Sequence, residues 1–162
     1  MACELETERL SLRPIAPDDA PWHLELMGER DGGSTRTIDE DLVRLGELQA
    51  SALTNGVGFL TVRRRSDGVP LGYCGLLIGR ATLDEPEIAY ELLRRYHGQG
   101  YATEAARAVG SAAADTGRRR LWSTVRTWNA PSFRVLEKLG FRRNHSETDG
   151  RGELVYLVRE LR

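Results

Sequence analysis

The sequence contains few cysteines and histidines and no long apolar run. Its 162 residues include two cysteines, Cys3 and Cys74, and three histidines. Two cysteines are too few for a disulfide framework, so we interpret both as small buried or incidental residues, and no Cys or His pair has metal-ligand spacing. No apolar stretch approaches the roughly 20 residues of a membrane span, and the acidic start at Glu4, Glu6 and Glu8 is unlike a signal peptide. We therefore expect a cytoplasmic protein with no metal and no membrane partner.

An excess of charge of either sign is also absent. The chain carries 23 Lys and Arg against 24 Asp and Glu, for a formal net charge of −1. This balance gives no electrostatic reason to bind nucleic acid or an anionic membrane. The length is that of one ordinary domain, and a hydrophobic fraction of 40% allows a real core. We expect residues 1–162 to form a single domain.

The most informative stretch, residues 87–106, combines a strand, a glycine loop and the start of a helix. Residues 88–93 are apolar and β-favouring, Gly98 and Gly100 follow in a loop, and a helical pattern begins near Tyr101. Closely spaced glycines let a ligand approach the backbone, and the next helix offers free N–H groups at the positive end of its dipole. The stretch therefore predicts a phosphate-binding turn. It lacks the third glycine of a dinucleotide fingerprint and the Gly-Lys-Ser/Thr end of a P-loop, which argues against NAD and ATP.

Three segments carry a resemblance to a known family. Arg-Tyr-His-Gly-Gln-Gly at 95–100 is similar to the Arg/Gln-x-x-Gly-x-Gly/Ala motif of the GNAT superfamily of acetyl-CoA-dependent N-acetyltransferases. Its continuation Gly-Tyr-Ala-Thr-Glu-Ala, and residues 6–14, resemble the RimJ/RimL branch of ribosomal-protein alanine N-acetyltransferases. Residues 129–141 resemble the second GNAT motif, Asn-x-x-Ser-x-x-Val-x-x-Lys-x-Gly-Phe. The resemblance covers nearly the whole chain.

The resemblance implies an α/β (α+β) fold with one GNAT-type domain. Its central sheet would be mixed and mostly antiparallel, with about six or seven strands, a splay between the fourth and fifth strands, and about four flanking helices. The residue pattern itself predicts strands at 10–13, 87–93 and 121–125, a hairpin of 57–64 with 70–78, and a closing strand pair around Asp149 and Gly150. It also predicts helices at 100–116 and from Asn129 to a Gly140 stop.

Two further helices are expected before the hairpin. Asp18 or Asp19 can cap the first, and Thr37 with Glu40 forms a capping box for the second, at 39–53. The second helix carries leucines at close to helical spacing, which we expect to pack on one face: Leu42, Leu45, Leu48 and Leu53. In the family, these two helices border the acceptor site.

Acetyl-CoA is the cosubstrate that the resemblance implies. The loop at 95–100 and the first turn of the next helix would hold its pyrophosphate through backbone N–H groups. In the family, the strand before this loop pairs its exposed backbone with the pantetheine arm. The expected cofactor-binding residues are Leu92, Leu93, Arg95, Gly98, Gln99, Gly100, Tyr101, Thr103, Asn129 and Ser132.

Glutamates are the candidate bases, because an amine must lose a proton before it attacks a thioester. At pH 7 a lysine amine is neutral in only about one part in a few thousand, and an α-amine in about a tenth. Glu87 and Glu91 lie on the same side of their predicted strand, where paired carboxylates can raise one another's pKa; both also suit solvent-facing positions. Glu147 lies about where some RimJ/RimL-type enzymes carry a catalytic glutamate.

The leaving thiolate is the point at which this chain departs from the family pattern. Many GNAT enzymes carry a tyrosine four residues before the glycine of Gly-Phe, and this chain has Leu136 there. The resemblance therefore moves the role to Ser132, which also fits a first-turn residue that bonds its own backbone. A catalytically silent acyl-CoA-binding or sensing module remains the alternative.

The acceptor and the oligomeric state stay open. A protein N-terminus, a lysine and a small-molecule amine such as an antibiotic or a polyamine are all compatible with the motifs. The second predicted helix is acidic, which favours a cationic acceptor but also fits an ordinary solvated face. We expect a monomer or a homodimer.

Overall fold

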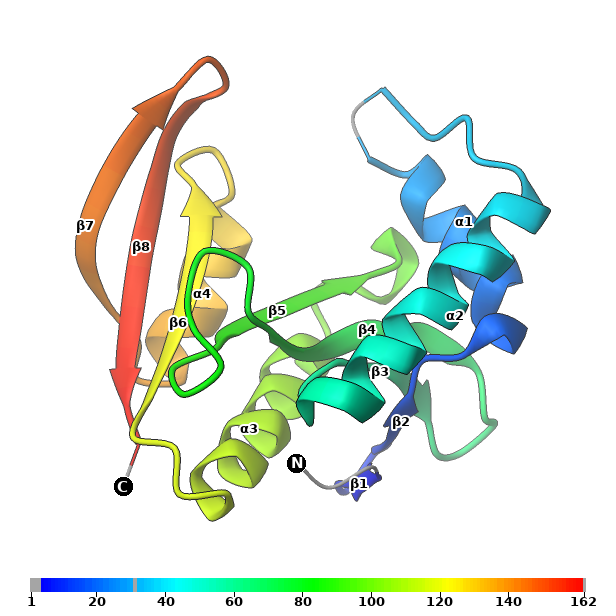
Figure 1. Ribbon diagram of the computed structural model, residues 1–162, viewed down its shortest axis with the longest axis horizontal. Coiled ribbons are helices and arrows are strands. Elements are labelled where there is room, and N and C mark those ends of the chain that lie inside the picture. The colour runs from blue at the N-terminus through cyan, green and yellow to red at the C-terminus, as the bar shows by residue number, and fades with distance from the viewer. Residues whose placement is uncertain (1–3, 31, 162) are drawn as a thin grey trace.

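The computed structural model describes residues 4–30 and 32–161, so Cys3 lies outside the described residues (Figure 1). The strands are β1 (Leu5–Glu6), β2 (Leu10–Pro14), β3 (Phe59–Arg64), β4 (Pro70–Leu77), β5 (Glu87–Leu92), β6 (Arg120–Arg126), β7 (Arg142–Asp149) and β8 (Gly152–Glu160). The helices are α1 (Ala20–Gly28), α2 (Ile38–Asn55), α3 (Tyr101–Asp115) and α4 (Ala130–Lys138), with short 3-10 turns η1 (Pro17–Asp19) and η2 (Arg94–Tyr96). No helix in the described ranges is both long and apolar enough to span a bilayer.

The strands form one mixed sheet in the order β1-β2-β3-β4-β5-β6-β8-β7. Its neighbouring strands are antiparallel, except that β5 and β6 run parallel and share only the pair Glu87 and Trp122. Beyond that pair, β6, β8 and β7 diverge from the rest of the sheet (Figure 1). Counted from β2, the diverging strands are the fourth and fifth, so the predicted splay is confirmed. The two-residue β1 is the strand that the sequence pattern did not predict.

Alternation of side chains along the strands divides the core between the two sides of the sheet. Leu60 and Leu92 belong to the larger cluster, which contains residues of α3 and α4. Tyr73 and Leu93 pack with the smaller cluster, which contains residues of α1 and α2. We call these two faces the α3 side and the α1 side. The splay between β5 and β6 therefore opens between two layers of helices.

Small residues let α3 lie close to the sheet, as predicted. Ala105, Val109 and Ala113 on its inner face are fully buried. After the helix ends, Gly117 has a φ of +84°, and its amide donates to the carbonyl of Ala114 over 2.9 Å. This left-handed glycine confirms the predicted C-terminal stop. The close packing fixes the position of the N-terminus of α3 relative to β5.

Both ends of α4 are capped by the residues that the sequence predicted. The Asn129 side chain accepts from the amide of Ser132 over 3.3 Å at the start of the helix. At its end, Gly140 has a φ of +85°, and the amide of Phe141 donates to the carbonyl of Leu136 over 3.0 Å. This is the Schellman arrangement. The caps hold Ser132 in the first turn of α4.

The buried face of α2 differs from the prediction. The capping box is confirmed, with the Glu40 amide 3.2 Å from the Thr37 hydroxyl and the Thr37 amide 2.8 Å from the Glu40 carboxylate. Leu45 is buried, but Leu42 and Leu53 are 38% and 80% exposed. At 100° per residue, these two leucines point roughly 60° and 80° away from Leu45, which faces the sheet. The expected single leucine face was therefore wrong.

Asp19 occupies the N-cap position of α1, as predicted, but its side chain makes no capping hydrogen bond. Its buried carboxylate accepts from the Trp22 indole, the Thr61 hydroxyl and the Arg63 guanidinium, each over 2.8 Å, and from the Ala16 amide over 3.0 Å. These bonds join η1 and α1 to β3. A buried carboxylate needs such partners, which the local cap geometry alone does not supply.

Candidate active site

The loop between β5 and α3 leaves backbone amides exposed. Residues 97–100 are exposed, and Gly98 and Gly100 have φ values of +73° and +82°, which an L side chain rarely adopts. A Cβ added at Gly98 would meet nothing within 4 Å. Within the described ranges, the amides of residues 98–103 have no acceptor, and the Glu104 amide makes the first bond of α3. Half-buried Thr103 lies in this first turn. Free backbone amides and a hydroxyl group at the N-terminus of a helix suit an anion.

Arg9 attaches this loop to the turn between β1 and β2, a role that the sequence did not reveal. Its backbone amide and its Nε bond the two carboxylate oxygens of Glu104 over 2.9 and 2.7 Å, and its guanidinium donates to the Gln99 carbonyl over 3.0 Å. The Thr7 hydroxyl also donates to Glu104, over 2.5 Å. Burial raises the pKa of Glu104, but these hydrogen bonds outweigh it and hold the pKa below its ordinary value. The Arg9 guanidinium thus lies beside the N-terminus of α3, in an ion pair with Glu104.

Two of the predicted binding residues direct their side chains elsewhere. The Arg95 guanidinium pairs with Glu25 of α1 rather than lying over the loop. The side chain of Tyr101 is buried in the larger core, with the Arg9 guanidinium 4.4 Å from its ring centre. Only the backbone of these residues is therefore placed for a ligand at the loop.

The backbone of β5 also distinguishes Leu92 from Leu93. The Leu93 amide donates to the Leu71 carbonyl over 2.9 Å, so Leu93 faces β4. In an antiparallel ladder successive residues face opposite edges, so the backbone of Leu92 and Tyr90 faces the splay. The Leu92 carbonyl accepts from the His97 ring over 2.7 Å. An extended ligand arm at this edge would meet Leu92 and Tyr90, and the role predicted for Leu93 does not fit its hydrogen bonds.

Tyr90 reaches across the splay to Ser132 of α4. Its hydroxyl donates to the Ser132 carbonyl over 3.3 Å, and burial raises the pKa of Tyr90 to about 12. A hydrogen bond from the Ser132 side chain lowers the pKa of Tyr90 and so opposes part of the effect of burial, whereas Leu136 is fully buried. The two hydroxyl groups therefore share one end of the splay. Nothing local in the sequence places Tyr90 near a residue 42 positions away.

Glu87 lies at the point where β5 and β6 still pair. Its side chain is 7% exposed, accepts from the Thr124 hydroxyl, and accepts from the Arg80 amide over 3.3 Å. It lines a cavity of about 340 Å³ on the α1 side, between the β4–β5 loop and the strands β6, β7 and β8. Figure 1 shows this loop, in green, passing across β6. The cavity therefore meets the splay on the face opposite α3.

The predicted Glu147, whose side chain is exposed, lines the same cavity. Its carboxylate accepts from the Tyr156 hydroxyl over 3.0 Å, and burial and this hydrogen bond raise the pKa of Tyr156. The His145 ring stacks on Tyr156 at 4.3 Å between centroids, and Trp122 lies 6.2 Å from His145. The structure therefore brings Glu87 and Glu147 to one cavity beside a row of aromatic rings. No group of three or more metal-ligating side chains occurs within residues 4–30 and 32–161.

Glu91 shares the face of β5 with Glu87 but belongs to a different cluster. Its carboxylate accepts from Arg30 over 2.5 to 3.1 Å and from the Tyr73 hydroxyl over 3.1 Å. Four residues along a strand separate it from Glu87 by about 13 Å, beyond the range at which two screened carboxylates interact strongly. The two glutamates therefore do not form the close pair that we expected.

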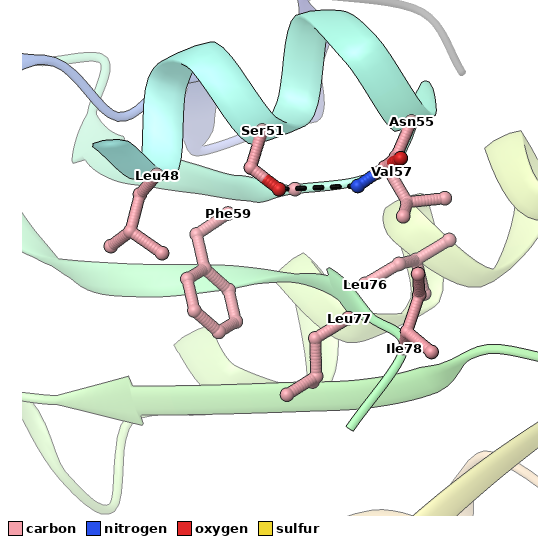
Figure 2. Close-up of a pocket in the computed structure, with 9 residues that line it drawn as sticks. Leu48, Ser51, Asn55, Val57, Phe59, Leu76, Leu77 and Ile78 are labelled. Carbon is pink, nitrogen blue, oxygen red and sulfur yellow. Dashed lines mark hydrogen bonds between the residues drawn. The ribbon is translucent and has the colours of Figure 1, made fainter. Parts of the chain in front are cut away.

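A smaller cavity, of about 130 Å³, lies between the second half of α2 and strands β3 and β4 (Figure 2). Leu48, Phe59 and Leu77 line it, and its polar side chains, Ser51 and Asn55, bond one another over 3.2 Å. No titratable side chain lines it. We interpret it as incomplete packing beneath α2, in keeping with the single fully buried leucine of that helix.

Comparison with known proteins identifies the family. Residues 9–142 match the family model of the acetyltransferase (GNAT) domain. The chain belongs to this family. Members of the GNAT family generally use acetyl-CoA to acetylate an acceptor. No protein with a curated description matches the sequence.

Solved structures support the same fold over the whole length. A protein from Bordetella pertussis described as a GNAT-family acetyltransferase is 25% identical, with a TM-score of 0.83 over 96% of this chain and 98% of its own. One from Vibrio cholerae, described as a ribosomal-protein-serine acetyltransferase, is 17% identical, with a TM-score of 0.80 over 99% of both chains. The aminoglycoside acetyltransferase AAC(6')-Ib, in complex with coenzyme A, is 18% identical, with a TM-score of 0.75 over 93% of this chain and 94% of its own.

Below 25% identity such likeness concerns the fold alone, and the last two structures differ in the acceptor that their names state. The narrower RimJ/RimL assignment therefore stays a prediction.

Proposed function

We propose that this GNAT protein transfers the acetyl group of acetyl-CoA directly to a primary amine in a ternary complex. The observation that carries the proposal is the run of unbonded amides at 98–103, at the end of a strand whose next edge is open. Amides at a helix N-terminus attract a pyrophosphate, each contact contributing about 0.3–1 kcal/mol. Arg9 holds the loop through the Gln99 carbonyl, and the backbone of Tyr90 and Leu92 would pair with the pantetheine arm.

Glu87 is the base that we assign. It is buried, it lines the cavity on the acceptor side, and two hydrogen bonds hold its carboxylate in place. Glu91 is a weaker candidate, because Arg30 and Tyr73 already occupy its oxygens. Glu87 would take the proton of the amine directly or through one water.

Tyr90 and Ser132 would stabilise the departing thiolate. A thiol has a pKa of about 8.5, and burial raises that of Tyr90 to about 12. Complete proton transfer from Tyr90 to the thiolate would thus be uphill by about 5 kcal/mol. We therefore assign both hydroxyls the role of hydrogen-bond donors, with the final proton supplied by the amine that reacts.

The experiment measures thiol release from acetyl-CoA with a panel of amines and N-terminal peptides. Glu87→Gln should lower kcat by about 100-fold or more, the usual size of a lost general base, with an unchanged Kd for acetyl-CoA. Ser132→Ala should lower kcat far more than acetyl-CoA affinity. Glu153→Gln, an exposed residue at the start of β8, is the matched control. Rates within twofold of wild type for Glu87→Gln would remove the base assignment.

The buried Leu136 at the family's tyrosine position supports one second candidate, a binding module without catalysis. That candidate predicts tight acetyl-CoA binding and no amine-dependent thiol release with any acceptor in the panel.

A further inference from the structure

The cavity that contains Glu87 has an unusual supply of hydrogen-bond acceptors. Three carboxylates line it, those of Glu85, Glu87 and Glu147, against one guanidinium, that of Arg80. The Arg120 side chain, which does not line the cavity, lies 3.4 Å from Glu85 and also pairs with Glu160. Among the described residues, neither Glu87 nor Glu147 forms an ion pair, and Arg80, whose positive charge acts on the nearby Tyr156, offsets only part of their charge.

Three neutral donors that line the cavity are already used by these carboxylates. The Trp122 indole donates to Glu85 over 3.0 Å, the Thr124 hydroxyl donates to Glu87, and the Tyr156 hydroxyl donates to Glu147 over 3.0 Å. A peptide end would bring carbonyl oxygens that need donors, and among the described lining residues only the side chains of Arg80, Thr82 and His145 could still supply them. A ligand rich in N–H donors and positive charge fits the same surface, because carboxylate oxygens accept several bonds each.

Strand pairing places the hydrogen-bond partners of Glu87 and Glu147 side by side. Glu87 is held by Thr124 and Glu147 by Tyr156, and Thr124 and Tyr156 face each other across β6 and β8. Such cross-strand neighbours have Cα atoms about 5 Å apart. The rings of His145 and Tyr156 stack on the same face, which suits an alkyl chain or a cation. A volume of about 340 Å³ is enough for a small ligand.

We propose that the acceptor is a small amine with two cationic nitrogens, a diamine or polyamine. The reacting nitrogen lies at Glu87, and the second lies at Glu147 against the Tyr156 and His145 rings. This inference rests on the proposed acetyl transfer. A cationic acceptor is now expected because of the carboxylates of this cavity and no longer because of the acidic residues of α2. In α2, Asp41 is buried against His23 and Arg36, and Glu40 caps the helix, so neither is available to an acceptor.

The test compares 1,4-diaminobutane with butylamine and with an Ala- or Ser-initiated tetrapeptide, by thiol release from acetyl-CoA. We expect kcat/KM for the diamine to exceed that for the monoamine by roughly tenfold, the equivalent of about 1.4 kcal/mol. Glu147→Gln should raise KM for the diamine about tenfold and reduce its advantage over butylamine. Glu153→Gln, with the same charge change on the same hairpin but outside the cavity, should leave both unchanged. Equal use of diamine and monoamine, or a preference for the tetrapeptide, would overturn the inference while leaving acetyl transfer intact.

Direct calorimetric titration of 1,4-diaminobutane, with and without acetyl-CoA, separates the two proposals. Binding that Glu147→Gln weakens, without release of thiol from any amine, would support the cavity assignment and refute the transfer reaction. Thiol release with other amines, together with no diamine binding or reaction, would overturn the diamine site alone.

Discussion

Glu104→Gln should detach the loop of residues 97–100 from the N-terminal strands. In the wild type, this carboxylate accepts from the Thr7 hydroxyl, the Arg9 amide and the Arg9 Nε, over 2.5, 2.9 and 2.7 Å. Its side chain is 19% exposed, so water replaces these donors poorly. A glutamine keeps one acceptor oxygen and turns an NH₂ group toward donors that it cannot satisfy.

The magnitude follows from the number of lost bonds. Each hydrogen bond to a charged group contributes about 1.5–3 kcal/mol, and one or two of the three are lost, partly offset by solvent. We expect the free energy of unfolding to fall by about 2–3 kcal/mol, which lowers the Tm of a domain of this size by roughly 5–10 °C. Because Arg9 also holds the Gln99 carbonyl, the affinity for acetyl-CoA should fall as well.

The stability difference between wild type and Glu104→Gln should depend on pH. Hydrogen bonds hold the pKa of folded Glu104 below its ordinary value of 4.5, despite burial. The carboxylate therefore stabilises the fold above about pH 4.5, and this contribution is lost as the pH falls through the lowered pKa. The difference in stability between wild type and Glu104→Gln should be constant near neutral pH and shrink in acid.

Chemical denaturation across pH, with isothermal titration of acetyl-CoA, measures both effects. Glu137→Gln, which changes an exposed side chain of α4 with no partner among the described residues, is the control. A Tm for Glu104→Gln within 1 °C of that control at pH 7 would refute the reasoning, as would a difference that does not change with pH.

Three further predictions concern packing and backbone. Asp41→Asn should lower the free energy of unfolding, measured by urea denaturation, by about 3 kcal/mol, because this fully buried carboxylate bonds the ring of buried His23 over 2.9 Å. A loss below 1 kcal/mol would contradict this prediction. Gly72→Ala should destabilise the folded protein by about 3 kcal/mol, since a Cβ there would lie 2.1 Å from a backbone carbonyl of β5. An unchanged Tm would show instead that the two strands can shift to make room. Gly98→Ala should lower the free energy of unfolding by about 1 kcal/mol, because Gly98 has a left-handed φ, and should leave the affinity for acetyl-CoA almost unchanged. Gly98→Glu should abolish acetyl-CoA binding. Equal binding by the two variants would remove the phosphate assignment.

Features that depend on near neighbours in the chain were predictable from the sequence. The Thr37–Glu40 capping box, the Gly140–Phe141 helix stop and the glycine loop between a strand and a helix all appear where their spacing indicated. Each involves residues only a few positions apart, so backbone geometry and local hydrogen bonds decide it. The family motifs are also of this kind, which is why the overall fold and its splay could be expected.

Features that join distant segments were decided by the tertiary structure. Glu87 and Glu91 have the same residue type on the same face of one strand, yet Thr124 holds one in a cavity and Arg30, 61 positions away, neutralises the other. Arg9 meets Glu104 across 95 positions. The sequence by itself determined the helices, the strands other than β1 and the glycine turn between β5 and α3. Only the packing of separate elements decided which carboxylates and hydroxyls meet, because long-range partners leave no periodic pattern along the chain.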